Sequence, residues 1–160
     1  MVAVALNSVI GKPDGGLPWS IPEDTAYFKK TTEGGVMIEG TVCYTELGGA
    51  LPDRGTVVVS ASARKSFPGA SRASSLDVAL RIADKLPYDG PVWICGGEKI
   101  YAEGLPHCSR LYITRIDKAY EGEGYKVFPS DWSKYFTRLV SSRASQYEDI
   151  NFVFEVWERS

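Results

Sequence analysis

The sequence has few of the residues that build metal sites and disulfide frameworks. Its 160 residues include one histidine, His107, and three cysteines, which lie far apart at Cys43, Cys95 and Cys108. No Cys-x-x-Cys pair occurs, and an odd number of isolated cysteines favours reduced thiols over disulfides or a zinc centre. We therefore expect a cytoplasmic protein without a bound metal. We interpret His107 as a surface residue of a turn and the cysteines as small apolar side chains that fill space.

Long apolar runs and blocks of like charge are also missing. No segment approaches the roughly 20 apolar residues that span a bilayer, and the run Met1–Leu6 is short for a signal peptide and has no basic leader. The net charge is −2, and no run of lysine and arginine is long enough to indicate nucleic-acid binding. With 44% apolar residues, the chain fits one packed domain, residues 1–160. We expect no membrane or nucleic-acid partner.

Apolar runs of strand length alternate with helical patterns over about the first 106 residues, and only strand patterns follow. The run Met1–Leu6 fits a buried strand, although the end of a buried helix would look similar. Further strands are expected at Val36–Ile38, Thr56–Ser60, Pro91–Cys95, Arg110–Ile116, Tyr135–Ser142 and Phe152–Glu158, and helices at Glu23–Thr32, Thr41–Leu47, Leu76–Lys85 and after Gly97. This order predicts an α/β fold, a mostly parallel sheet with helices on both faces and an antiparallel C-terminal edge.

The helix expected to begin around Pro22 carries an acid on the same face as two aromatic residues. Asp24, Tyr27, Phe28 and Thr31 follow the spacing i, i+3, i+4 and i+7, which places them on one side of a helix. Such an acid either binds or protonates a ligand, or begins the helix at its rim, where backbone N–H groups satisfy it. The residues that precede the helix favour the first interpretation. Lys12–Gly16 is a turn-rich loop close to an apolar wall at Trp19, a combination typical of lids.

Three strand-to-helix junctions have the features of a nucleotide site. Ligands of parallel sheets bind beyond the carboxyl ends of the strands, where helix N-termini point. Gly40-Thr41 and Gly96-Gly97 each open a helix, and Ser60 ends a strand. The bare backbone of Gly96-Gly97 would suit a diphosphate, although it could equally be a packing turn. Neither G-x-G-x-x-G nor a Walker sequence is present, so the nucleotide folds that carry them do not apply.

Short segments spread over nearly the whole chain match a known family in order and spacing. They are Asn7–Gly11, Leu17–Trp19, Ile21–Asp24, Tyr27–Lys29, Gly40, Leu51–Arg54, Val58–Ser60, Ile94–Tyr101, Leu111–Ile116 and Phe128–Pro129. Together they resemble the dihydrofolate reductases. The Pro-Trp and Pro-Glu-Asp pair is the specific part of this resemblance, whereas the Gly-Gly pair alone is not.

The resemblance implies a central, mostly parallel eight-stranded sheet and the reduction of 7,8-dihydrofolate to tetrahydrofolate with NADPH. Asp24 would hydrogen-bond the pteridine and promote protonation of its N5, while the hydride comes from the nicotinamide C4. Trp19 would hold an ordered water and form a wall of the pteridine pocket. Thr114 would bond to Asp24 or to the water that links it to the ligand. We expect a monomer whose partner is the small-molecule substrate.

The remaining site residues follow from the same resemblance. Phe28, Leu47 and Leu51 would line the p-aminobenzoyl site, and Arg54 would clamp the glutamate α-carboxylate through two contacts. The nicotinamide would be surrounded by Ala3, Ile10, Leu17 and Tyr101; Ala3 and Cys95 would also border the substrate. The rest of the cofactor would meet Gly40, Thr41, Val42, Cys43, Ser60, Arg64, Gly96, Gly97, Glu98, Lys99 and Ile100. The Gly96–Gly97 bond is cis in this family, and Lys12–Gly16 would be the lid. Without the resemblance, Arg54 could equally be a surface arginine after a turn. Tyr101 could be a packing residue of its helix, but its position after Gly-Gly favours the cofactor cleft.

Several positions depart from the family pattern. The basic residue that grips the 2′-phosphate of NADPH is absent at Thr41, and Cys43 replaces a threonine. Our hypothesis is that Arg64 or Lys65 supplies the charge; the alternative is that NADH is also used well. The acidic loop 121–129 is about two residues longer than usual, and Cys95 stands where a larger aliphatic residue is common.

Two other functions are compatible with parts of the sequence. One is a related reductase that acts on a ribosylated pyrimidine of riboflavin synthesis, although that group lacks the acid on this helix. The other is a nucleotide-binding protein that has lost catalysis, which the altered stretch 40–44 suggests.

Overall fold

The computed structural model describes residues 1–160, and its contacts divide the chain into two compact units. The first unit comprises Met1–Asp24 and Gly104–Ser160, and the second comprises Thr25–Glu103. Helix α1 (Pro22–Thr32) begins in the first unit and continues in the second.

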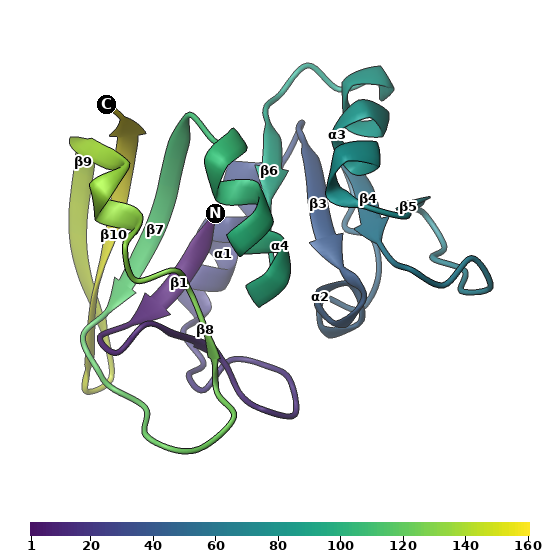
Figure 1. Cartoon of the computed structure of the whole chain (residues 1–160). Coiled ribbons are helices and arrows are strands. Elements are labelled where there is room, and N and C mark those ends of the chain that lie inside the picture. The colour runs from purple at the N-terminus through teal and green to yellow at the C-terminus, as the bar shows by residue number, and fades with distance from the viewer. The chain divides into compact units, whose positions relative to one another are not determined.

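A four-stranded mixed sheet forms the frame of the first unit. Its order is β1 (Val2–Ala5), β7 (Arg110–Ile116), β10 (Ile150–Arg159) and β9 (Phe136–Tyr147). Strands β1 and β7 are parallel, whereas β10 runs antiparallel to both β7 and β9. Figure 1 shows the long hairpin of β9 and β10 beside β7. Aromatic and branched side chains fill its core, and the largest fully buried ones are Phe128, Phe136, Phe152, Ile113 and Ile116.

Smaller elements complete the first unit. Strands β2 (Val9–Gly11) and β8 (Lys126–Val127) form an antiparallel pair, and η1 (Leu105–His107) and η2 (Trp132–Lys134) are short 3-10 helices. The exposed residue His107 therefore ends a 3-10 turn, in agreement with the prediction of a surface turn.

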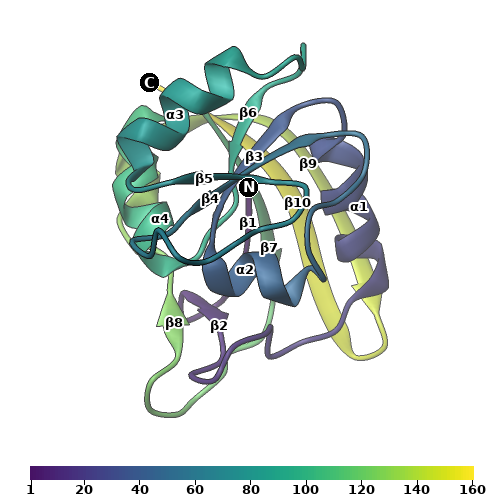
Figure 2. The same cartoon turned by 90° about the vertical axis from the view of Figure 1, so that its right-hand side faces the viewer.

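A four-stranded parallel sheet forms the frame of the second unit. Its order is β5 (Ser71–Ala73), β4 (Gly55–Val59), β3 (Val36–Gly40) and β6 (Val92–Ile94), and every pairing is parallel. The helices are α2 (Thr41–Glu46), α3 (Leu76–Lys85) and α4 (Glu98–Gly104). Gly104, the last residue of α4, already belongs to the segment Gly104–Ser160 of the first unit. Figure 2 shows β5, β4 and β3 as neighbours with α3 packed beside them.

The position of α3 follows from its sequence. Leu76, Ala79 and Ala83 are buried and form the apolar stripe of the helix. The Ser75 hydroxyl caps the first turn by accepting a hydrogen bond from the N–H of Val78 at 3.3 Å. The helix packs against all four strands of the sheet. This burial covers one part of the sheet, whose strand order is set by the pairing of the strands.

The strand order of this sheet reverses at one point. From β3 the chain moves outward to β4 and β5, and it then returns to the other side of β3 to form β6. In open parallel sheets, ligands bind at the carboxyl ends of the two strands that flank such a reversal. Here those ends are Gly40 and the segment that begins at Cys95.

The structure confirms the α/β class and most of the predicted elements, but it corrects the expected sheet. Backbone hydrogen bonds define two sheets of four strands each, one parallel and one mixed, in place of a single eight-stranded, mostly parallel sheet. The sheet of the first unit is mixed because the long hairpin pairs antiparallel with β7, which pairs in parallel with β1 on its other side. Met1–Leu6 contains a strand and not a helix end.

Three short strands, β2, β5 and β8, do not appear in the sequence-based prediction. Each has only two or three residues, and each pairs on one side only. Such strands are held by backbone bonds to a distant partner and carry no alternating pattern of their own. All three cysteines are free thiols. None of the helices combines the length and the apolar character that crossing a bilayer requires.

Candidate functional site

Asp24 in the first turn of α1 is a buried acid with one defined side-chain partner. Its side chain is 8% exposed, and the Thr114 hydroxyl donates a hydrogen bond of 2.7 Å to its Oδ1 atom. Burial raises the pKa of Asp24 above its ordinary value, the bond from Thr114 opposes this, and the nearby charge of Glu23 adds to the increase. Asp24 is thus a carboxyl group held closer to its protonated form than an exposed aspartate would be.

The hydroxyl that contacts Asp24 is fixed by the centre of the mixed sheet. Thr114 lies on β7, opposite Ala3 of the parallel strand β1 and opposite Phe154 of the antiparallel strand β10. Strand β7 is therefore held on both sides, and Thr114 is 2% exposed. The separation of 90 residues between Thr114 and Asp24 shows that the fold brings this pair together.

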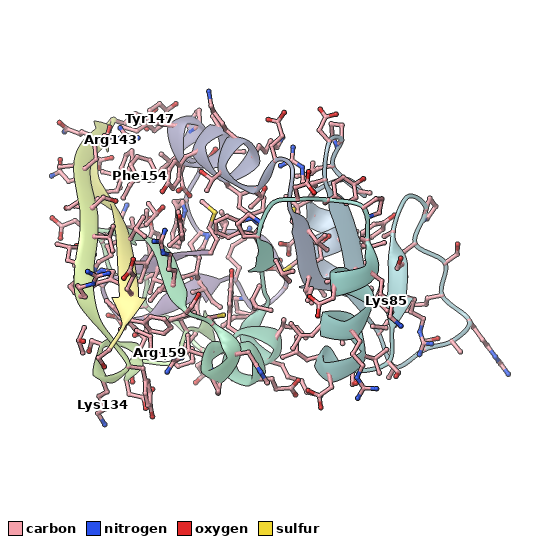
Figure 3. The ribbon with its side chains drawn as sticks, turned by 90° about the horizontal axis from the view of Figure 1, so that it is seen from above. Lys85, Lys134, Arg143, Tyr147, Phe154 and Arg159 are labelled. Atoms are coloured by element: carbon pink, nitrogen blue, oxygen red, sulfur yellow. The ribbon has the colours of Figure 1, made fainter.

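Glu23, which precedes Asp24, fastens the same helical turn to the hairpin. Its carboxylate accepts hydrogen bonds from Arg143 at 2.8 Å and from the Ser145 hydroxyl at 2.6 Å, both on β9. These two bonds lower the pKa of Glu23. The guanidinium of Arg143 also lies 4.4 Å from the centre of the Phe154 ring, and Figure 3 shows these two side chains next to each other. The start of α1 is consequently held by side chains as well as by backbone.

Trp19 lies in the segment that leads into α1. It is 6% exposed, its ring packs 5.6 Å from that of Tyr120, and its buried Nε1–H has no acceptor within the chain. A buried indole N–H without a protein acceptor fits a role in binding water or ligand. Within the predicted lid, Lys12–Gly16, two backbone hydrogen bonds join residues of the loop to one another.

Arg54 in the second unit is a buried cation without an acidic partner. It is 8% exposed, and its Nε donates to the carbonyl of Pro52 at 2.8 Å. Its Nη1 donates to the Thr32 hydroxyl at 2.8 Å and to the carbonyl of Lys29. A buried charge normally has a counter-ion, so this guanidinium is suited to an anionic ligand. Phe28, Leu47 and Leu51, the predicted aminobenzoyl residues, are half-buried in the same unit.

Two glycines are joined by a backbone hydrogen bond at the point where the parallel sheet reverses its strand order. The N–H of Gly40 donates to the carbonyl of Gly96 at 2.8 Å. The Gly96–Gly97 peptide bond is cis, as the resemblance predicts, and Gly96 has a φ of 111°. A Cβ atom at Gly96 would lie 3.0 Å from the ring of Tyr101. The positive φ and the close Tyr101 ring together favour glycine at residue 96.

The family of the chain follows from comparison with known proteins. The family model described as dihydrofolate reductase matches residues 1–159. The dihydrofolate reductase of Bacillus subtilis is 36% identical over 155 residues, which cover 93% of this chain and 84% of the relative. That of Staphylococcus haemolyticus is 30% identical, with 99% and 93% covered. The chain belongs to the dihydrofolate reductase family.

A solved structure of this family has the same fold. The dihydrofolate reductase from Enterococcus faecalis, complexed with NADP(H) and RAB-propyl, matches with a TM-score of 0.84 and 26% sequence identity. The match covers 99% of this chain and 93% of that chain.

The two cations predicted for the cofactor site are not held by the protein, whereas a third cation nearby is. Arg64 and Lys65 are exposed, and their side chains form no hydrogen bond or ion pair. The sequence-based prediction missed Arg72 on β5, whose Nε donates to the carbonyl of Ser60 at 3.0 Å. The signal that would have found it is the pairing of β5 with β4, which returns residue 72 to the end of β4.

Glu39 is a second residue that the prediction missed, and it is a buried acid on a strand. It is 1% exposed near the end of β3, and its Oε2 atom has no hydrogen-bond partner. Burial raises the pKa of Glu39 to about 7. Burial, with smaller contributions from the charges of Glu46 and Glu39, raises the pKa of the Cys43 thiol to about 12, so Cys43 is not a reactive nucleophile.

Of the remaining predicted residues, Ile10 is buried and Leu17 is exposed, both in the first unit. Thr41 is half-buried and Val42 is exposed at the start of α2, while Cys95 and Ile100 are buried on either side of the glycine pair. Glu98 and Lys99 are exposed on α4, where Lys99 lies 3.9 Å from Glu103. No cluster of three or more histidine, cysteine, aspartate or glutamate side chains could hold a metal ion.

Proposed function

We propose that this protein reduces 7,8-dihydrofolate to 5,6,7,8-tetrahydrofolate with NADPH. The observation that carries the proposal is the Asp24–Thr114 pair, a buried acid held by a hydroxyl at 2.7 Å. Membership of the dihydrofolate reductase family over residues 1–159 supports it, as does the NADP(H) bound to the Enterococcus faecalis relative.

The cofactor fits the glycines at the carboxyl edge of the parallel sheet. Gly40 and Gly96 are joined there through backbone atoms, and a Cβ at position 96 or 97 would contact Tyr101 or Cys43, respectively. These backbone groups would hold the diphosphate. When bound, NADPH supplies the hydride from its nicotinamide C4. Ala3, Ile10, Leu17 and Tyr101 are proposed to contact the nicotinamide.

Asp24 is proposed to handle the proton that the reduction requires. Reducing the N5=C6 double bond of dihydrofolate adds a hydride at C6 and a proton at N5. Because Thr114 donates to Oδ1 of Asp24, the other carboxyl oxygen is left to bind the pteridine and to favour its protonated form, with the proton arriving through water. The raised pKa of Asp24 keeps a protonated fraction available closer to neutral pH.

Arg54 is proposed to bind the α-carboxylate of the substrate's glutamate. Its guanidinium is oriented by three protein oxygens and has no carboxylate partner in the chain. A planar guanidinium held in this way can form two parallel hydrogen bonds to a carboxylate. Phe28, Leu47 and Leu51 would contact the apolar part of the same ligand.

A spectroscopic assay tests the proposed function. The absorbance at 340 nm should fall when protein, dihydrofolate and NADPH are mixed. A fall only with the ribosylated pyrimidine would replace this function with the riboflavin-pathway reduction. Cofactor binding without turnover of either substrate would indicate a catalytically altered homologue.

The role of Asp24 has its own test. Asp24→Asn should slow hydride transfer at pH 7 by at least about 100-fold, within the usual range for general acid–base groups, and should recover partly at acid pH, where the substrate is already protonated. Asp117→Asn is the matched control, because Asp117 is an exposed aspartate of the same unit, and this variant should keep the wild-type rate. Wild-type rates for Asp24→Asn at pH 7 would exclude Asp24 as the proton-handling group.

Other parts of the sequence-based interpretation stay predictions. They are the single domain over residues 1–160, the monomeric and cytoplasmic state, the absence of nucleic-acid and membrane partners, and the lid role of residues 12–16. The water bound by Trp19 and the effect of the longer loop 121–129 also stay predictions.

A further inference from the structure

The carboxyl edge of the parallel sheet offers a second polar position beside the glycines. If the proposed function holds, the diphosphate of the cofactor lies where β3 and β6 end. Neighbouring strands are about 5 Å apart, and β4 is the next strand on the far side of β3. Ser60, which directly follows β4, is therefore about one strand spacing from the end of β3. This distance suits the adenosine ribose of a dinucleotide.

Arg72 supplies a positive charge at this position. It is half-buried on β5, in register with Val58 of β4. Its Nε–H donates to the carbonyl of Ser60 at 3.0 Å, which directs the guanidinium to the end of β4. No acidic side chain pairs with Arg72, and its Nη atoms donate to no group of the chain. The cation is thus oriented by the backbone and left available for an anion.

The turn after β4 adds hydroxyl groups to the same place. Ser60 is 8% exposed, and its Oγ accepts a hydrogen bond of 3.3 Å from the N–H of Ser62. The Ser60 hydroxyl proton is therefore free to be donated to another acceptor. A guanidinium and a hydroxyl at one strand end are the kinds of donors that bind a phosphate monoester.

The other residues considered for binding this phosphate are less suited to the role. Thr41, at the start of α2, carries no charge. Arg64 and Lys65 are exposed and have no contacts that orient them, so binding would have to restrict long, flexible side chains. Arg72 has already lost part of this freedom, because one of its nitrogens is bound to Ser60.

We propose that Arg72, held on the carbonyl of Ser60, binds the 2′-phosphate of the adenosine ribose and makes this protein select NADPH over NADH. The proposal rests on the proposed function for the identity of the cofactor. It replaces Arg64 and Lys65 as the source of the positive charge that is missing at Thr41.

Steady-state kinetics of Arg72→Gln with the two cofactors test the proposal. Loss of charged hydrogen bonds to the phosphate should lower kcat/KM for NADPH by about 10- to 100-fold, while kcat/KM for NADH should change by less than about twofold. Arg81→Gln, an equivalent change at an exposed arginine of α3, should alter neither value. Equal losses with both cofactors, an unchanged ratio, or a loss of NADPH preference in Arg64→Gln instead would overturn the proposal.

Calorimetric titration with 2′,5′-ADP and 5′-AMP separates this proposal from the proposed reaction. The wild-type protein should bind 2′,5′-ADP at least about tenfold more tightly than 5′-AMP, and Arg72→Gln should lose that difference. Such a result in a protein that fails to reduce dihydrofolate would overturn the proposed function alone, whereas equal wild-type affinities would overturn the role of Arg72. If Arg72→Gln does not fold, Arg72→Lys should keep part of the preference, and a full preference with lysine would contradict recognition by an oriented guanidinium.

Discussion

The buried carboxyl group of Glu39 should make the stability of this protein depend on pH, and Glu39→Gln should remove that dependence. The side chain is 1% exposed, and one of its oxygens has no hydrogen-bond partner. Burial is the cause of the increase in its pKa from 4.5 to about 7. The substitution keeps the size of the side chain and removes its ability to ionise.

The expected magnitude follows from proton linkage. An acid whose pKa is higher in the folded state resists ionisation there, so it favours unfolding once the pH exceeds its value in the unfolded chain. For Glu39, the loss of folding stability begins near pH 4.5 and reaches its full size somewhat above pH 7. A pKa difference of this size corresponds to about 3 kcal/mol. The free energy of unfolding of Glu39→Gln relative to wild type should therefore rise by about 3 kcal/mol between pH 4 and pH 8.

Urea unfolding at a series of pH values measures this difference. The buried amide of glutamine adds an offset that does not vary with pH, so the slope and not the absolute difference is diagnostic. Glu33→Gln is the control, because Glu33 is exposed in the same unit, and its difference from wild type should be flat over this range. A flat difference for Glu39→Gln as well would refute the idea that the folded protein holds this carboxyl group away from water.

Three further substitutions test individual contacts. Thr114→Val removes the hydrogen bond that lowers the pKa of Asp24, so the pH above which the rate of reduction falls should move upward in the pH–rate profile; an unmoved profile would contradict this. Gly35→Ala places a Cβ 2.3 Å from the carbonyl of Pro91 and should lower the free energy of unfolding by about 2–3 kcal/mol in urea melts; an unchanged midpoint would show that the backbone adapts. Arg54→Gln should raise the KM for dihydrofolate at least about tenfold and leave the KM for dihydropteroate, which lacks the glutamate, unchanged; equal effects on both would exclude a carboxylate contact.

Local patterns predicted the elements whose stability is local. The helix Leu76–Lys85 has the predicted bounds because its apolar stripe and its serine cap lie within a dozen residues. The strand Arg110–Ile116 is likewise where its alternating sequence places it. Strand β5 could not be found in this way, because Ser71–Ala73 is a strand only through its pairing with β4.

The site shows the same limit. Asp24 was singled out from the spacing of one helix, but its partner Thr114 is 90 residues away and was predicted through resemblance to a family. Arg72 could not be predicted from its place in the sequence, because it lies 12 residues after Ser60 and only the pairing of β5 with β4 brings the two together. Glu39 was not predicted as a buried acid, because a glutamate near the end of a strand usually indicates an exposed position. In the structure, neighbouring strands and helices bury it.

The outer strand of the long hairpin has a consequence for how copies of this protein meet in concentrated solution. Strand β9 pairs only with β10, so its other side offers backbone groups that could template fibre growth. Leu139 and Val140 are each 46% exposed on this strand, and an irregularity in the pairing interrupts the register beside them, between Val156 and Trp157. A broken register denies an incoming strand a continuous row of partners. Leu139 and Val140, the exposed apolar part of this edge, therefore lie where the strand is least able to pair with a strand of another copy.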